Sequence, residues 1–197
     1  MADLQIEFEE FPLRDAVAST STAASTPDHD PSASASSYDI FLNHRGPDVK
    51  NTFASYLYRR LVQQGLRVFL DRSELKEGLN FNSQIQAAIR TASVHVAIFS
   101  PRYAESKWCL DELLQMFESG APIIPVFYHV KPGELRWTQG EGGVYSRDLR
   151  KLEQKKTYDT QTGEEKPRHD PATIQKWRDA LSRVAEISGF ELDANYT

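Results

Sequence analysis

The sequence predicts an α/β fold built on an open, mainly parallel β-sheet flanked by helices. Two observations lead to this class. From residue 38 onward, short apolar runs alternate with segments of helical periodicity at a regular interval, as expected when helices connect parallel strands. Several of these runs are almost unbroken, a pattern typical of strands that are covered on both faces. In sheets of this kind, ligands bind beyond the carboxyl ends of the strands.

The first half of the fold contains three predicted strands and two helices. After the first strand, residues 46–48 interrupt the apolar run, and Asp48 is expected to cap the helix that follows. Gly65 suits the left-handed position that ends this helix, and a polar loop over residues 71–80 precedes the second helix. The strands are expected at residues 38–42, 66–70 and 94–99, and the two helices have apolar faces formed by Val49, Phe53, Leu57 and Leu61 and by Ile85, Ala88, Ile89 and Ala92.

The second half begins with a third helix and a fourth strand, which is expected at residues 123–128. Pro125 is a complication in this strand, because proline donates no ladder hydrogen bond. The region 131–168 is polar and rich in glycine and charge, so we expect a loop there with one helical piece around residues 146–156.

A last helix is predicted with Asp170 as its cap, Pro171 in its first turn and Gly189 beyond its end. Residues 16–37 are mostly Ser, Thr, Ala, Pro and Asp, which bury too little apolar surface to offset the entropy of ordering. The roughly 160 remaining residues match one ordinary domain with a single core. The predicted organisation is a disordered tail over residues 1–37, one domain over residues 38–190 and a short tail over residues 191–197.

Charge and cysteine content limit the classes of function. The net charge of -5 does not favour tight electrostatic binding to nucleic acid, which requires an excess of basic residues. A local basic patch is the alternative. Cys109 is the only cysteine, so the chain cannot form an internal disulfide or a thiolate metal cluster. No apolar run approaches the roughly 20 residues that span a bilayer, and the amino terminus is acidic where targeting peptides are basic. We expect a protein of the cytoplasm, with the nucleus as a second location, and no membrane partner.

Several common motifs are absent from the sequence. It has no P-loop, no Gly-x-Gly-x-x-Gly after the first strand and no His-Glu-x-x-His, and its five histidines are scattered. A response-regulator receiver domain requires an acidic residue at the end of the third strand, where this chain has Ser100 after Phe99. The polar residues that follow predicted strands, and are therefore expected at the ligand-binding edge, are Arg45, Asp71 and Ser100.

Residues 106–113 (Ser-Lys-Trp-Cys-Leu-Asp-Glu-Leu) are the most informative segment. On a helix, Trp108, Glu112 and Met116 are expected to share one side, because residues four apart lie on the same face. An indole beside a carboxylate suits a ligand with a flat ring and a positive charge, such as the nicotinamide dinucleotide NAD. The opposite, core-facing stripe is expected to consist of Leu110, Leu113, Leu114 and Phe117.

Three blocks together resemble the plant-type Toll/interleukin receptor (TIR) domain: residues 38–48, the loop through Gly78 and residues 106–113. The resemblance runs to about Gly189 and implies a flavodoxin-like TIR fold, in a free-standing domain or one cut from a longer chain. The family's first block usually contains Ser-Phe-Arg-Gly-Glu-Asp, and its first helix carries a Ser-His pair. The positions that depart from the family pattern are Asn43, His44, Pro47, Lys50 and Tyr56.

The resemblance implies cleavage of the nicotinamide–ribose bond of NAD+ or NADP+, giving nicotinamide and ADP-ribose or a cyclised isomer. The dinucleotide is then a substrate, and no cofactor or metal is expected. Nicotinamide leaves as a neutral molecule, so one carboxylate that stabilises the oxocarbenium-like ribose suffices, and Glu112 is the catalytic candidate. Ser55 and Tyr56 are expected at a self-association surface. The expected substrate-binding residues are Arg45, Gly46, Pro47, Asp48, Lys50, Gly78, Ser106 and Trp108.

Simpler alternatives exist for each of these residues. Glu112 is then a solvated surface acid, Trp108 a core residue and Arg45 a partner of Asp48, whereas Cys109 is expected to be a small buried hydrophobe. The alternative function is a non-catalytic adaptor that acts through contacts with other TIR domains. A third possibility, hydrolysis of RNA or DNA, is not favoured by the acidic charge balance.

Overall fold

The computed structural model describes residues 38–70, 79–136 and 143–193; the predicted tail over residues 1–37 and most of the predicted loop over residues 71–80 lie outside these ranges. Its centre is a five-stranded sheet of order β2-β1-β3-β4-β7 in which every pairing is parallel. This confirms the predicted flavodoxin-like class. The strands are β1 (Ile40–His44), β2 (Val68–Leu70), β3 (Val94–Phe99), β4 (Ile123–Tyr128) and β7 (Phe190–Leu192).

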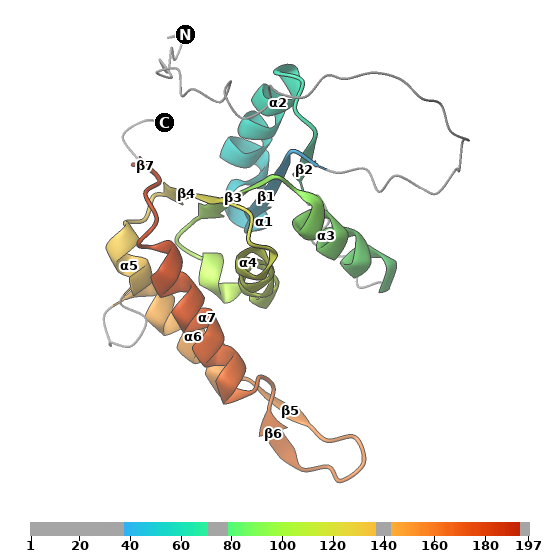
Figure 1. The fold of residues 1–197 in the computed structure, drawn as a ribbon. Coiled ribbons are helices and arrows are strands. Elements are labelled where there is room, and N and C mark those ends of the chain that lie inside the picture. The colour runs from blue at the N-terminus through green and yellow to red at the C-terminus, as the bar shows by residue number, and fades with distance from the viewer. Residues whose placement is uncertain (1–37, 71–78, 137–142, 194–197) are drawn as a thin grey trace, which may run out of the picture. The chain divides into compact units, whose positions relative to one another are not determined.

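Helices lie on both faces of the sheet, with α2 on one side of the strands and α4 to α7 on the other (Figure 1). Asp170 and Pro171 begin the last helix as predicted, with Asp170 accepting a hydrogen bond from the Ala172 amide. The first face is covered by α1 (Gly46–Val49), the π-helical turn η1 (Lys50–Ala54) and α2 (Ser55–Gln63). The second face is covered by α3 (Leu79–Thr91), α4 (Lys107–Ser119), α5 (Pro132–Arg136), α6 (Val144–Gln154) and α7 (Pro171–Val184), with a 3-10 turn, η2 (Tyr103–Glu105), before α4.

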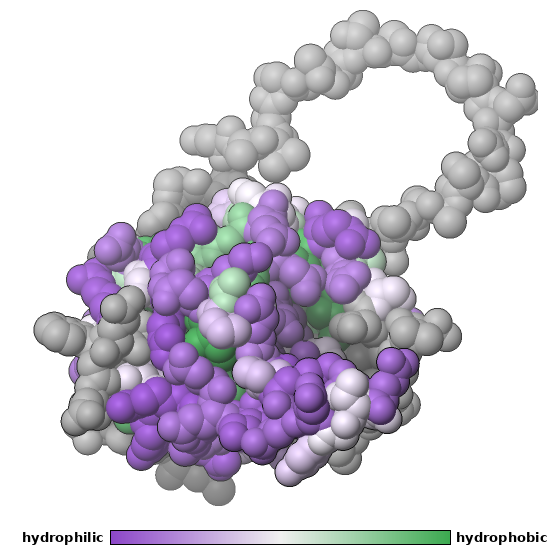
Figure 2. Space-filling view, turned by 90° about the horizontal axis from the view of Figure 1, so that it is seen from below, coloured by the Kyte–Doolittle hydropathy of each residue, from purple (hydrophilic) through white to green (hydrophobic). Residues whose placement is uncertain are grey.

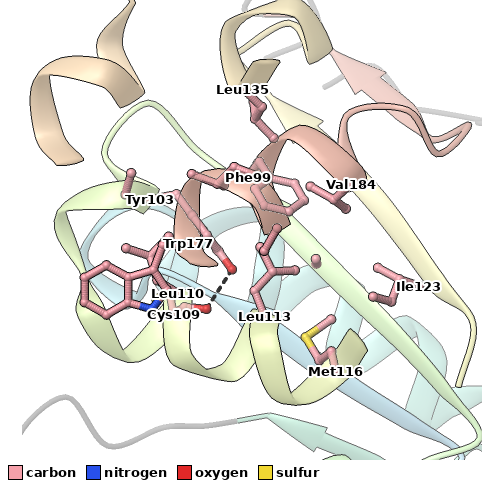
Figure 3. Packing of buried hydrophobic residues seen from close by; sticks show 14 of the residues in the cluster. Phe99, Tyr103, Cys109, Leu110, Leu113, Met116, Ile123, Leu135, Trp177 and Val184 are labelled. Carbon is pink, nitrogen blue, oxygen red and sulfur yellow. Dashed lines mark hydrogen bonds between the residues drawn. The ribbon is translucent and has the colours of Figure 1, made fainter. Parts of the chain in front are cut away.

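Alternate strand residues supply the two cores, because successive side chains of a strand point to opposite faces. Phe41 belongs to the larger core under α3, α4 and α7, whereas its neighbour Leu42 packs under α1 and α2. Figure 3 shows the larger core, in which Trp177 of α7 packs close to the α4 residues. The Trp177 indole donates a hydrogen bond from Nε1 to Asp111 Oδ1 at 3.0 Å, so the buried ring has a polar partner.

The first helical segment is broken where the sequence predicts a continuous helix. Thr52, in the middle of η1, has φ −121° and ψ −108°, so the backbone is not helical at this residue and the segment is kinked there. Val49, Phe53 and Leu57 nevertheless face the same core. The i+4 pattern therefore identified the buried face correctly, but the prediction of one continuous helix was wrong. Gly65 adopts φ +82° after α2, as predicted.

Several short elements were not predicted, among them the turn η2 and the helix α5. A small antiparallel hairpin of β5 (Lys156–Tyr158) and β6 (Glu165–Pro167) lies in the region expected to be loop, after a helix that covers residues 144–154. The strand β7 pairs with β4, so the proposed domain boundary at residue 190 falls inside a strand. Gly189 makes this pairing possible, since a Cβ there would lie 2.3 Å from the Pro125 carbonyl oxygen.

His95 of β3 is expected to make the free energy of unfolding depend on pH. Its side chain is fully buried, and this burial lowers its pKa from 6.5 to about 4. In the unfolded chain the His95 imidazole takes up a proton below about pH 6.5, whereas in the folded chain it stays neutral down to about pH 4. The stability that the neutral imidazole contributes is therefore fully present above about pH 6.5 and is lost as the pH falls from there toward pH 4. We expect urea unfolding to show that the contribution of His95 lowers the free energy of unfolding by about 2 kcal/mol between about pH 7.5 and pH 5.

The variant His95→Gln isolates this contribution from that of the other titrating groups. It keeps a polar side chain near Ser119 Oγ, which lies 3.1 Å from His95 Nε2, but it does not titrate. The variant should lose much less stability than the wild type over the same pH range. Equal losses in the two proteins would contradict the prediction.

Candidate active site

Glu112 of α4 is oriented by a buried relay of polar groups near the carboxyl end of β1. Asn43 is completely buried, and its Nδ2 donates a hydrogen bond to Glu112 Oε2 at 2.8 Å. The buried Tyr103 hydroxyl donates to Asn43 Oδ1 at 2.5 Å and also lies 3.0 Å from the Cys109 carbonyl oxygen. Burial raises the pKa of Tyr103 well above its usual value, so the phenol remains a hydrogen-bond donor. The relay therefore holds the Asn43 amide with its N–H groups toward the carboxylate.

Trp108 lies one turn before Glu112 and is 53% exposed, so the alternative of a core tryptophan is wrong. The Lys107 ammonium sits 4.0 Å from the centre of its ring. Ser106 caps the helix, since its Oγ accepts a hydrogen bond from the Cys109 amide at 3.4 Å. The start of α4 thus presents an accessible indole and a positioned carboxylate on neighbouring turns.

Met116 was expected on the same side as Trp108 and Glu112, and this expectation is wrong. Its side chain is fully buried in the larger core. The helix packs against both the sheet and α7, so its buried arc is wider than a single stripe and is rotated relative to the prediction. The buried residues of α4 are Cys109, Leu110, Leu113 and Met116, and Leu114 and Phe117 are only partly buried.

Arg45 follows β1 and is held by two carboxylates. Its Nη1 lies 2.5 Å from Asp48 Oδ1, and its Nη2 lies 3.1 Å from Glu105 Oε2. The Ser100 hydroxyl donates to the other Asp48 oxygen at 2.6 Å, so the residues that follow β1 and β3 meet at Asp48. Asp48 does not cap a helix as predicted, because its oxygens are occupied by Arg45 and Ser100, and Arg45 stands at the N-cap position of α1. The ion pair named as the alternative for Arg45 is present.

Glu105 was not singled out by the sequence, yet it joins three cations. Besides Arg45, it accepts from Arg102 at 2.9 Å and lies 3.7 Å from Lys151 Nζ. Burial opposes its ionisation, but the hydrogen bond and charge of Arg102 and the charges of Arg45 and Lys151 outweigh this and lower its pKa. Glu105 is therefore a charged counter-ion at neutral pH.

The other predicted residues occupy several positions around this network. Gly46 and Pro47 form the first turn of α1, and Lys50 begins η1. Ser55 donates its hydroxyl to the Lys50 carbonyl, and Tyr56 of α2 is 53% exposed. The remaining two, Gly78 and Asp71, lie outside the described residues.

Cys109 is buried, as predicted, and its thiol donates to the His44 carbonyl oxygen at 3.4 Å. Burial, reinforced by the nearby Glu112, raises the pKa of this thiol. A thiolate nucleophile at this position is therefore disfavoured, and Glu112 is the stronger catalytic candidate.

The relay residues Asn43 and Tyr103 were missed as site residues. Asn43 was noted only as a departure from the family pattern, although an amide at the end of an apolar strand is a polar group that burial obliges to find partners. Tyr103 has no comparable sequence pattern, because its partner lies 60 residues away in the chain.

In the three ranges that the structure describes, no helix combines the length and apolar character that a membrane crossing requires. The fold and the site together define a flavodoxin-like α/β domain with its polar centre at the carboxyl ends of β1 and β3. The TIR domain profile matches residues 37–196. The chain belongs to the TIR domain family.

Three relatives place the chain within this family. A Brachypodium distachyon protein named probable 2' cyclic ADP-D-ribose synthase BdTIR is 45% identical over 141 residues, or 66% of this chain and 63% of that protein. Disease resistance protein RUN1 from Vitis rotundifolia is 32% identical over 167 residues, or 81% of this chain and 11% of that protein. The TIR domains in the activated Roq1 resistosome, which directly recognizes the pathogen effector XopQ, share the fold with a TM-score of 0.64 and 35% identity, over 81% of this chain and 90% of that one. The chain spans less than two thirds of the length of the first two relatives.

Proposed function

We propose that this chain cleaves the nicotinamide–ribose bond of NAD+ or NADP+, giving nicotinamide and ADP-ribose or a cyclic ADP-ribose isomer. The observation that carries the proposal is the Glu112 carboxylate, held by Asn43 at 2.8 Å and placed one turn from the exposed Trp108. The similarity to a probable 2' cyclic ADP-D-ribose synthase supports the same reaction class. The relatives named as disease resistance proteins support a role for the product in plant defence.

The proposed chemistry needs few protein groups. As the bond from ribose C1′ to the pyridinium nitrogen breaks, its electron pair neutralises the ring, and nicotinamide leaves without a general acid. The ribose gains oxocarbenium character, which the Glu112 carboxylate stabilises electrostatically. Water or a hydroxyl of the product then adds to C1′ and loses its proton, giving the hydrolysed or the cyclised product.

The test compares the wild type with Glu112→Ala, both concentrated, by chromatography of nicotinamide and nucleotide products after incubation with NAD+. The wild type is expected to release nicotinamide, and Glu112→Ala is expected to lose at least about 100-fold in rate. Glu118→Ala, at an exposed position near the end of the same helix, is the matched control and should keep the wild-type rate. Turnover that persists in Glu112→Ala would remove Glu112 from the mechanism.

Self-association is the second part of the proposal, and it also defines the alternative function of a TIR adaptor. Tyr56 presents an exposed aromatic ring on α2, whereas the Ser55 hydroxyl is used within the chain. The likeness to TIR domains of a resistosome favours assembly of copies. The specific activity is expected to rise with protein concentration in a dilution series, in parallel with oligomer measured by light scattering. Oligomers without nicotinamide release at any concentration would favour the adaptor.

A further inference from the structure

The β5–β6 hairpin forms a small sheet of its own beyond the ends of α6 and α7 (Figure 1). Each of its strands has three residues, and no other strand in the described part of the chain pairs with either of them. Tyr158 of β5 is 68% exposed, more than any other large apolar side chain of the described ranges. An isolated two-stranded ladder is only marginally stable in water, so a further strand would stabilise this hairpin.

The hydrogen bonds at the two ends of the hairpin show which backbone groups point outward. The Asp159 amide donates to the Glu164 carbonyl oxygen at 2.8 Å. The Arg168 amide donates to the Lys155 carbonyl oxygen, also at 2.8 Å. Bonded and non-bonded residue pairs alternate along an antiparallel ladder, and the backbone groups of a non-bonded pair face away from the partner strand. The non-bonded pairs of this ladder are Lys156 with Pro167 and Tyr158 with Glu165.

The two outer edges of the hairpin therefore differ. On the β6 edge Pro167 has no N–H, which prevents regular pairing with a further strand. On the β5 edge Lys156 and Tyr158 each offer an outward N–H and C=O. A partner strand fits β5 and not β6, so an assembly formed through β5 closes after two copies.

A second copy of β5 is complementary to the first. When two β5 strands pair antiparallel about a two-fold axis at Thr157, Lys156 of each copy lies opposite Tyr158 of the other. The outward backbone groups of these two residues then exchange hydrogen bonds, and the lysine ammonium meets the tyrosine ring. Thr157 lies opposite its own counterpart, which is a favourable cross-strand pair. We propose that β5 is a self-association strand that joins two copies of the chain in one continuous antiparallel sheet.

The surface around the hairpin suits a contact of this kind. Figure 2, which views the molecule from the side on which the hairpin lies in Figure 1, shows a surface made mainly of hydrophilic residues. The charges of the hairpin are balanced in place, since Lys156 Nζ lies 2.7 Å from Glu165 and Lys166 Nζ lies 2.8 Å from Asp159. Two copies can therefore approach without strong repulsion, and backbone pairing supplies the specificity. The inference rests on the self-association part of the proposed function and names a surface for it outside α2.

The first test places a cysteine at the proposed two-fold axis. Thr157→Cys in the full chain is expected to form a disulfide-linked dimer under mild oxidation, because the Cα atoms of a non-bonded antiparallel pair lie about 4.5 Å apart, within the range that a disulfide spans. Thr160→Cys is the matched control, since two residues at that position would lie about 20 Å apart along the strands. The wild type, with its buried Cys109, gives the background on non-reducing denaturing electrophoresis. Cross-linking of Thr157→Cys that does not exceed that of Thr160→Cys would overturn the proposal.

Hydrogen exchange in the wild type is the second test and needs no substitution. The outward amides of Lys156 and Tyr158 face water in a single copy and are bonded in the pair, so their exchange is expected to slow about fivefold or more between dilute and concentrated protein. The outward amide of Glu165, on the β6 edge, is the internal control and should exchange at the same rate in both. Oligomers in light scattering without protection of the β5 amides would remove β5 from self-association and leave the proposed function standing. Neither test depends on nicotinamide release.

Discussion

Replacing Asn43 by leucine is expected to lower kcat for nicotinamide release by about 10- to 100-fold while KM stays within about twofold. Leucine has a similar volume but no amide, so Glu112 Oε2 would lose the hydrogen bond that now joins it to Asn43 at 2.8 Å. A hydrogen bond to a charged group is worth about 1.5–3 kcal/mol, and its loss makes the orientation of the carboxylate less well defined. Steady-state kinetics of nicotinamide release measure kcat and KM separately.

Two further variants define the relay. Tyr103→Phe removes the hydroxyl that donates to Asn43 Oδ1 but leaves the amide in place, so its loss of kcat should be smaller than that of Asn43→Leu. Asn51→Leu, at an exposed position in η1, is the control and should not change kcat. If Asn43→Leu keeps the wild-type kcat and a wild-type melting curve, the orientation of Glu112 by Asn43 has no role in the reaction.

Gly189→Ala is expected to lower the free energy of unfolding by about 1–3 kcal/mol. An added Cβ would lie 2.3 Å from the Pro125 carbonyl oxygen and 2.6 Å from Pro125 Cγ, so β7 would have to move away from β4. Both obstacles belong to one strand of the sheet, and the backbone oxygen cannot change rotamer to make room. Urea unfolding at neutral pH measures the change.

The control for this prediction is Gly133→Ala in α5. A Cβ at Gly133 would meet nothing within 4 Å, and alanine favours the helical conformation. This variant should be neutral or slightly stabilising. Equal destabilisation of the two variants would show that the approach of Gly189 to β4 is not the cause.

Local patterns predicted the features of this chain that depend on local geometry. The apolar runs of β1, β3 and β4 identified the central strands, because burial on both faces leaves an unbroken signature. The relation of Trp108 to Glu112 followed from the helix repeat alone. The site depended further on a contact between residues 69 positions apart, Asn43 and Glu112, which no local pattern contains.

The elements that were missed are short or depend on tertiary contacts. The strand β7 has three residues, too few for a periodicity to be recognised, and it pairs only because Gly189 fits against Pro125. The burial of Met116 depends on a second packing partner for α4, which the single-stripe prediction did not include. The break at Thr52 leaves the apolar spacing intact, so the spacing alone did not reveal it.

Glu105 forms ion pairs with cations from three separate parts of the chain: Arg45 after β1, Arg102 before η2 and Lys151 in α6. A shared counter-ion of this kind provides redundancy, since the loss of one cation leaves the carboxylate with two others. Replacement of the carboxylate, in contrast, removes the one acid that all three cations share and leaves only Arg45 and Lys151 with another acidic partner, Asp48 and Asp148 respectively. Sequence variation should therefore be tolerated at each cation singly and constrained at the acid, which makes Glu105 the position that limits how this corner of the domain can diverge.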